Sequence, residues 1–181
     1  LKAQTTYGKS YNKVKIAGAY TTREVGEYDT TAEVDVWGTV AKTTTVGSSI
    51  KFIKNESGAA EKIASGSYIT VSVNDPFGTL VSQRTDGVSL NKIITGVDGS
   101  GNAVYEVVSV GAYSTVATVD EYGTVTATET KGYSTKKVDE SGEIKDFKTG
   151  AYTTLSENNV YGVLKAQTTY GKSYNKVKIA G

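Results

Sequence analysis

The 181-residue sequence contains no cysteine, no histidine and no methionine, and it has one proline and one tryptophan. Without cysteine the fold cannot be cross-linked by disulfides, and the redox compartment cannot be inferred. The commonest general base, the thiol nucleophile and the soft metal ligands are also missing. These absences exclude most hydrolase triads and predict a chain that is not an enzyme and has neither a cofactor nor a metal.

Charge and hydrophobic content are also limited. The 20 Lys and Arg residues nearly balance the 19 Asp and Glu residues, and hydrophobic residues make up 38% of the chain. Because no block of like charge stands out, we expect no nucleic-acid partner. No apolar run reaches the roughly 18 residues of a membrane span, and no signal peptide is recognisable. The few large apolar side chains favour a thin sheet or solenoid over a thick core.

The sequence repeats itself at two scales. Residues 1–18 recur unchanged as residues 164–181, an offset of 163. Three origins remain open: a longer tandem array, a recent duplication, or a chain that overlaps itself around a continuous polymer. Within this unit a Gly-small-Tyr-x-Thr motif begins at Gly18, Gly66, Gly111 and Gly150. It divides the chain into a partial copy, 1–17, which matches 164–180, and four subrepeats, 18–65, 66–110, 111–149 and 150–181.

A second motif, an acidic or amide residue followed by an aromatic and a glycine, occurs once in each subrepeat. Its spacing predicts that the aromatics occupy equivalent places and pack as a structural ladder rather than as a carbohydrate platform. The ladder residues are Trp37, Phe77, Tyr122 and Tyr161, and the turn glycines are Gly38, Gly78, Gly123 and Gly162.

Alternating and β-branched runs between these signals, such as 68–73 and 114–119, favour strands. The glycine motifs supply the tight connections of antiparallel pairs, and each subrepeat is expected to form roughly two hairpins. We therefore predict an all-β fold of antiparallel hairpin repeats. It forms a sandwich, an arch or a solenoid-like sheet that continues between subunits.

Other residues offer weaker chemical signals. Asp98, Ser100 and Asn102 are candidate oxygen ligands for calcium, although a plain glycine-rich turn is favoured. The acidic neighbours at 120–121 and 139–140 are interpreted as solvated turns rather than catalytic pairs. Asn55 begins a sequon and is a candidate glycosylation site. The threonines at 124, 126, 128 and 130 share one strand face, a pattern that suits an exposed sheet better than an ice- or sugar-binding array.

The two repeated motifs and the long duplication resemble repeat-built prokaryotic surface proteins: archaeal sheath or cell-wall fibre subunits, surface-layer-like proteins and adhesin stalks. The resemblance implies an extracellular, cell-surface or cell-wall location and a mechanical role. It predicts a homopolymer in which strands pair between copies and pack like a zipper, as in amyloid. The alternative is a glycan-binding adhesin or fibre module, which would need one non-repeated concave site rich in aromatics.

Overall fold

The protein is one antiparallel sheet of nine strands in which sequence neighbours pair throughout. The computed structural model describes residues 2–16, 18–55 and 57–175. The strands are β1 (Ala3–Ile16), β2 (Ala19–Val34), β3 (Val40–Lys54), β4 (Ala60–Asn74), β5 (Leu80–Val97), β6 (Ala103–Val119), β7 (Val125–Glu140), β8 (Glu143–Asn158) and β9 (Leu164–Ser173). No helix occurs in these three stretches.

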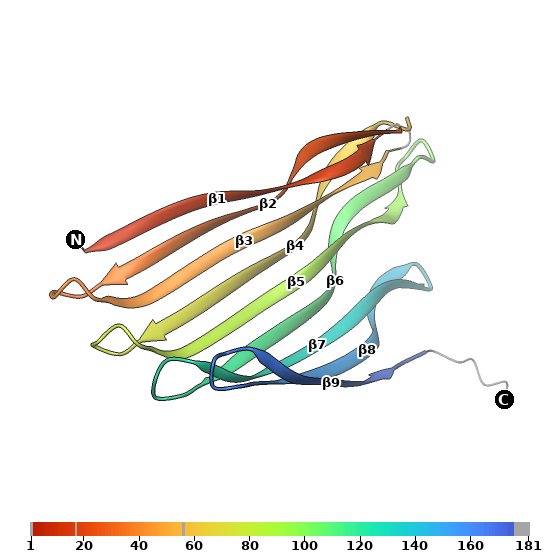
Figure 1. Ribbon diagram of the computed structural model, residues 1–181. Helices are drawn as coiled ribbons and strands as arrows, with labels where there is room; N and C mark the ends of the chain where they lie inside the picture. Colours follow the sequence, from red (N-terminus) through yellow and green to blue (C-terminus); the bar gives the residue numbers. More distant parts are fainter. Residues whose placement is uncertain (1, 17, 56, 176–181) are drawn as a thin grey trace, which may run out of the picture.

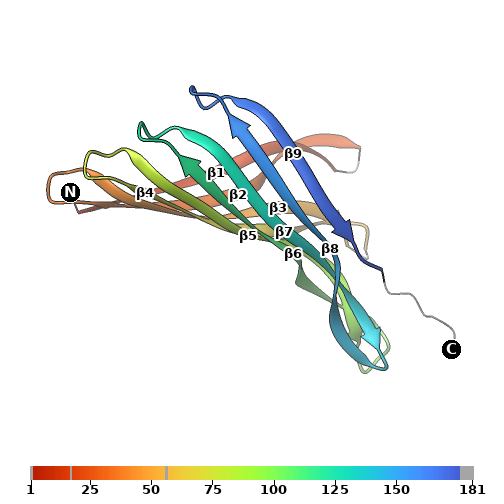
Figure 2. The ribbon, with the colours of Figure 1, turned by 90° about the horizontal axis from the view of Figure 1, so that it is seen from below.

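The predicted all-β fold of antiparallel hairpin repeats is confirmed, in the form of a single open sheet. Figures 1 and 2 show one curved, twisted layer with β1 at one edge and β9 at the other. Because single strands reach 18 residues, a subrepeat spans about two strands instead of the two hairpins expected, and β4, β6 and β8 each cross a subrepeat boundary. Alternation along such strands gives the sheet two different faces, both open to solvent.

Five of the turns share one side-chain arrangement, which Asp35 illustrates. Its Oδ1 atom accepts hydrogen bonds from the backbone N–H groups of Trp37 and Thr39, each at 2.8 Å. Gly38 donates its N–H to the Asp35 carbonyl and takes φ 90°, a left-handed conformation that favours glycine. The same bonds recur at Asp75, Asp120 and Asn159 in the other aromatic motifs, and at Asp98 at the opposite end of the sheet. In the turn that begins at Asn55, Oδ1 accepts from the Ala59 N–H and the Ser57 hydroxyl, and Gly58 donates to the Asn55 carbonyl.

A row of bulges crosses the middle of the sheet and explains a second set of glycines. Pairing shifts by one residue immediately before Gly26, Gly66, Gly111 and Gly150. At each of these glycines an added Cβ would lie 2.6 to 3.3 Å from a carbonyl oxygen of the following strand. These positions therefore require glycine, because the backbone of the following strand lies too close to leave room for a Cβ atom. By this pairing, Gly26 is the residue of the first subrepeat that is equivalent to Gly66, Gly111 and Gly150. Gly18, where the sequence motif begins, lies in the turn between β1 and β2.

The bulges also divide the sheet into two halves. Pairing between β2 and β3 stops at Gly26, and the pairs β4–β5, β6–β7 and β8–β9 stop at the three equivalent glycines. Beyond this line only the hairpins remain, and Figure 1 shows them separating as they twist. We call these hairpins fingers 1 to 4; they comprise residues 11–24, 50–64, 90–109 and 135–148. The nine-stranded part is the continuous half.

Almost nothing in this fold is buried. Ile63, in finger 2, is the one hydrophobic side chain that is buried among the described residues, with 5% of its surface exposed. The chain exposes 12233 Å², whereas a compact monomer of 19.1 kDa exposes about 8,400 Å². Backbone pairing and cross-strand side-chain contacts therefore hold the sheet together, without a hydrophobic core.

Candidate functional site

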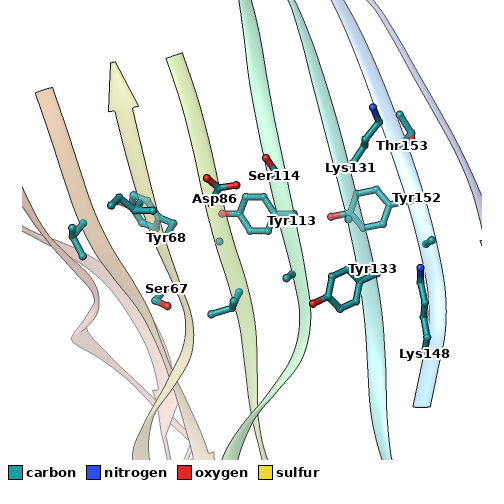
Figure 3. Close-up of a pocket in the computed structure, with 17 residues that line it drawn as sticks. Ser67, Tyr68, Asp86, Tyr113, Ser114, Lys131, Tyr133, Lys148, Tyr152 and Thr153 are labelled. Carbon is teal, nitrogen blue, oxygen red and sulfur yellow. The ribbon is translucent and has the colours of Figure 1, made fainter. Parts of the chain in front are cut away.

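Tyrosine and glycine alternate in a row that crosses all nine strands just beside the bulges. The row consists of Gly8, Tyr28, Gly47, Tyr68, Gly87, Tyr113, Gly132, Tyr152 and Gly171. Each tyrosine ring lies over the glycine of the preceding strand, where an added Cβ would overlap with it. Figure 3 shows three of these rings side by side. The glycines thus make room for a continuous ring layer on what we call the tyrosine face.

Threonines form a second row on the tyrosine face, two residues away from the first. They are Thr6, Thr30, Thr45, Thr70, Thr85, Thr115, Thr130, Thr154 and Thr169. Four pairs of Oγ1 atoms lie 2.8 to 2.9 Å apart, each pair joining an even-numbered strand to the next. Of the four threonines expected to share one face, Thr130 belongs to this row. The expectation missed the equivalent threonine in every other strand.

A third row reveals a repeat of four strands. Its residues are Gln4, Ala32, Thr43, Ser72, Gln83, Ala117, Thr128, Ser156 and Gln167. The order Gln, Ala, Thr, Ser occurs twice and then begins again in β9. Strands β1, β5 and β9 are therefore equivalent, and the 163-residue offset contains two four-strand units.

Both edges of the sheet present unpaired backbone in the part of the chain that the structure describes. The Lys2 carbonyl accepts from Val34 in β2, so residues 2, 4, 6 and 8 direct their backbone groups inward and residues 3, 5, 7 and 9 direct theirs outward. At the other edge, the Tyr174 N–H donates to the Thr149 carbonyl, so Tyr174 directs its backbone groups toward β8. Because this direction alternates along a strand, residues 167, 169, 171 and 173 of β9 direct their backbone groups away from β8. Every residue of β9 is exposed. Such edges are templates for another strand.

The four ladder aromatics lie at the turn tips along one end of the sheet, between β2 and β3, β4 and β5, β6 and β7, and β8 and β9. Trp37, Phe77, Tyr122 and Tyr161 are 80 to 90% exposed. The turns that begin at Asn55 and Asp98 place Ser57 and Ser100 at the equivalent position. The turn geometry therefore does not require an aromatic ring. Packing of these rings as a ladder stays a prediction about an assembly.

A hollow of about 830 Å³ lies over the continuous half, lined by residues from β3 to β8 (Figure 3). Tyr133 lies on the sheet face opposite to the tyrosine row, between Ala112 and Ala151 on the neighbouring strands. The Lys148 Nζ atom lies 5.7 Å from the centre of the Tyr133 ring. The equivalent position four strands earlier is Ser48, so this aromatic is not repeated. The hollow has the non-repeated ring that a glycan site would need.

Two of the three charged side chains that line the hollow, Asp86 and Lys131, are paired with neighbouring charges, and the third, Lys148, lies by the Tyr133 ring. Arg84 binds both carboxylate oxygens of Asp86, at 2.8 and 2.9 Å, and this hydrogen bonding holds the pKa of Asp86 below its ordinary value. Lys131 lies 2.9 Å from Glu129, which raises the pKa of the lysine. The hollow therefore offers hydroxyls, an aromatic ring and the ammonium group of Lys148.

The weaker candidates lie in turns. Asp98 Oδ1 accepts from the N–H groups of Ser100 and Asn102, and its Oδ2 accepts from the Asn102 amide, which lowers the pKa of Asp98. Asp120 closes its turn in the same way. Asn55 is exposed, and its Oδ1 accepts from Ala59 and Ser57.

Glu56 of the sequon and the side chain of Asp139 fall outside the described residues. Across the described ranges no group of three or more acidic side chains gathers as a metal site would require.

No family model, curated protein or solved structure matches this chain. In the ranges that the structure describes, no helix is long and apolar enough to cross a membrane. The candidate functional features of the described chain are its two open edges, three continuous side-chain rows, a line of exposed aromatics at the turn tips and the hollow around Tyr133.

Proposed function

We propose that the protein is a structural subunit of an extracellular polymer, a sheath, filament or surface layer, assembled by β-strand pairing between copies. The observation that carries this proposal is an open single-layer sheet whose side-chain rows run without interruption from β1 to β9. Nothing in that pattern ends the sheet at either edge. A further strand of the right register would extend every row.

The exposed surface supports the same proposal. The chain exposes 12233 Å², about 3,800 Å² more than a compact monomer of its mass. That excess falls in the range of about 2,000 to 5,000 Å² that obligate interfaces bury. Association would therefore cover the amount of surface that this fold leaves open.

The energy of one junction shows why the rows matter. The β8–β9 junction joins residues 150–158 to 164–173, and at about 1 kcal/mol net per backbone bond such a junction contributes about 9 kcal/mol. The loss of translational and rotational freedom on association costs about 4 to 15 kcal/mol. The free energy gained from backbone pairing alone is therefore similar to the free-energy cost of association. The tyrosine and threonine contacts then decide whether a polymer is stable.

The proposal assigns a mechanical role, with copies of the chain as partners. It includes no catalytic step, because the sequence has no histidine and no cysteine to carry the common mechanisms. Location at the cell surface or in the cell wall follows from the resemblance to repeat-built surface proteins and belongs to the proposal.

A single proline tests the edge directly. Thr5 is exposed and directs its N–H away from β2, so Thr5→Pro removes an outward donor and leaves the pairing within the chain intact. Thr5→Val keeps the donor and is the matched control. Sedimentation should show large assemblies for the parent and Thr5→Val and small species for Thr5→Pro, all with the same β-sheet circular dichroism. Unchanged assembly of Thr5→Pro would count against the proposal.

The second candidate function, a glycan-binding adhesin or fibre module, is favoured by the hollow around Tyr133. Tyr133 is 46% exposed and lines the same hollow as the hydroxyls of Ser114 and Thr153, a combination suited to sugar stacking and hydrogen bonding. A glycan array with the parent chain and with Tyr133→Ala tests it. Binding that is lost in Tyr133→Ala and kept in Trp37→Ser would assign the hollow as the site.

A further inference from the structure

Part of the β1 sequence occurs a second time in the sheet, where it pairs with a different strand. Residues 3–10 and residues 166–173 are identical, and they form the continuous-half parts of β1 and β9. In β1 this segment pairs with β2 and has one open side. In β9 the same segment pairs with β8 through the opposite side. The chain itself therefore shows what the open side of β1 binds: a strand with the sequence of β8.

The internal strand β5 supports this reasoning, because it is the equivalent of β1 with both neighbours present. It pairs with β4 on one side and β6 on the other. In the four-strand repeat, β6 corresponds to β2 and β4 corresponds to β8. The position next to β1 that is open in this chain thus belongs to a β8-type strand.

The register of the missing pair follows from the β8–β9 pairing. Transposed to β1, Gly8 lies beside Tyr152, Thr6 beside Thr154, and Gln4 beside Ser156. The tyrosine–glycine row, the threonine row and the four-residue order all continue across such a junction. Glycine stays beside tyrosine, as it does between every other pair of strands.

Simple addition of one sheet to the edge of another breaks these patterns. Strands β1 and β9 run in the same direction, because both are odd-numbered in an antiparallel meander. Placing β1 of the next copy beside β9 head to tail would create a parallel pair. It would also place Gly8 directly beside Gly171, whereas in every other strand pair of this row a glycine lies beside a tyrosine.

We propose that β1 of a second copy replaces β9 on β8, so that the chains form one antiparallel sheet with eight strands per copy. This inference rests on the proposed function and specifies its junction. The 163-residue offset between the two identical segments is then the repeat of the polymer. Strand β9 occupies the docking position in an isolated chain and leaves it when the next copy arrives.

Replacement gains contacts that β9 does not make, because β1 arrives with finger 1 attached. Within the chain, neighbouring fingers are linked: Glu24 of finger 1 lies 3.0 Å from Lys62 of finger 2. Lys92 of finger 3 lies 2.7 Å from Glu61 of finger 2. The Lys51 ammonium of finger 2 also donates to the Asn91 side chain of finger 3, at 2.8 Å. The equivalent residues at the new junction are Lys136 of finger 4 and Asn12 of an incoming finger 1, so this contact can form again, whereas the equivalents of Glu61 and Lys92 are Lys145 and Lys13 and form no ion pair. This added contact favours the incoming strand over the identical resident segment.

Cross-linking between two single-cysteine variants of the 181-residue chain tests the proposal, and the parent sequence has no cysteine of its own. Thr154 and Thr169 form a pair whose Oγ1 atoms lie 2.9 Å apart, so cysteines at such positions are close enough for a disulfide. Replacement predicts that Thr6→Cys chains mixed with Thr154→Cys chains yield an interchain disulfide between positions 6 and 154. Thr154→Cys/Thr169→Cys within one chain is the control for the resident pairing.

The other outcomes overturn the inference in distinguishable ways. Linkage of Thr6→Cys chains to Thr169→Cys chains would show edge addition, which keeps the proposed function and removes the replacement. Chains that form no interchain link and sediment as monomers would remove both.

Proline at position 169 gives an independent readout, because Thr169 directs its backbone groups away from β8. Replacement predicts that Thr169→Pro assembles at least as fast as the parent. A block of assembly in that variant would favour edge addition.

Discussion

The glycines of the tyrosine row should be intolerant of the smallest side chain, and Gly87 shows why. A Cβ at Gly87 would lie 2.5 to 2.6 Å from two ring carbons and the hydroxyl oxygen of Tyr113. Ordinary contacts between carbon atoms need about 3.5 Å or more, so the ring must leave its place over the glycine. Burial raises the pKa of Tyr113, which agrees with a ring partly covered in this row.

The expected cost can be estimated. Overpacking typically destabilises a protein by about 1 to 3 kcal/mol. Alanine in place of glycine returns about 0.4 to 1 kcal/mol, because it restricts the unfolded chain. Gly87→Ala should therefore lower the free energy of unfolding by about 1 to 2 kcal/mol. Gly96 is the matched control: it lies in the same strand, and an added Cβ there meets nothing within 4 Å.

Urea unfolding followed by circular dichroism measures the difference, with Thr5→Pro as the background that keeps the chain monomeric. Gly96→Ala should be neutral or slightly stabilising. In a Tyr113→Ala background the cost of Gly87→Ala should disappear, which gives a coupling of about 1 to 2 kcal/mol between the two sites. Equal stabilities of Gly87→Ala and Gly96→Ala, or no coupling to Tyr113, would refute the reasoning about the row.

Two further predictions concern the joint between fingers and the exposed turns. Glu24 binds Lys9 at 2.6 Å and Lys62 at 3.0 Å, and the hydrogen bond from Lys9 leads the causes that lower the pKa of Glu24. Because the folded pKa is depressed, this stabilisation is present above the ordinary glutamate pKa of about 4.3 and is lost as the pH falls through the folded value. The unfolding midpoint of Glu24→Gln should fall below that of the parent at pH 7 and converge with it in acid; a gap independent of pH would contradict this. Trp37 is the only tryptophan and is 88% exposed, so its fluorescence should shift to the blue if the turn tips become covered on assembly, whereas an unchanged spectrum in assembled material would show that they stay in water.

Much of the fold could be predicted from residue patterns. The Asp-x-aromatic-Gly segments specify their turns locally, since one carboxylate satisfies two backbone N–H groups and glycine takes the left-handed position. Alternation and β-branched residues indicate the strands, and the turns set antiparallel order. These signals act over a few residues, so they can be recognised without knowledge of the pairing.

The rows could not be predicted as readily, because they depend on register between strands. The motif at Gly18 resembles those at Gly66 and Gly111, yet the pairing makes Gly26 their equivalent. A signal for the rows was present: even-numbered strands carry Tyr-x-Thr, and odd-numbered strands carry Thr-x-Gly. Reversing direction from one strand to the next brings these two patterns into line.

The division into fingers depends on single unpaired residues at the bulges. Residues 25, 65, 110 and 149 are omitted from the pairing, and their identities, Val, Ser, Val and Thr, are ordinary strand residues. No composition signal marks them. The glycine that follows each one is informative only once the carbonyl that approaches it is known.

The most direct test of assembly by strand pairing is electron microscopy of the 181-residue chain at rising concentration. We expect ordered filaments, tubes or sheets. With eight strands per copy and about 4.8 Å between strands, the repeat along the polymer is about 38 Å. Dispersed single particles at every concentration, with the sheet intact by circular dichroism, would contradict assembly by strand pairing.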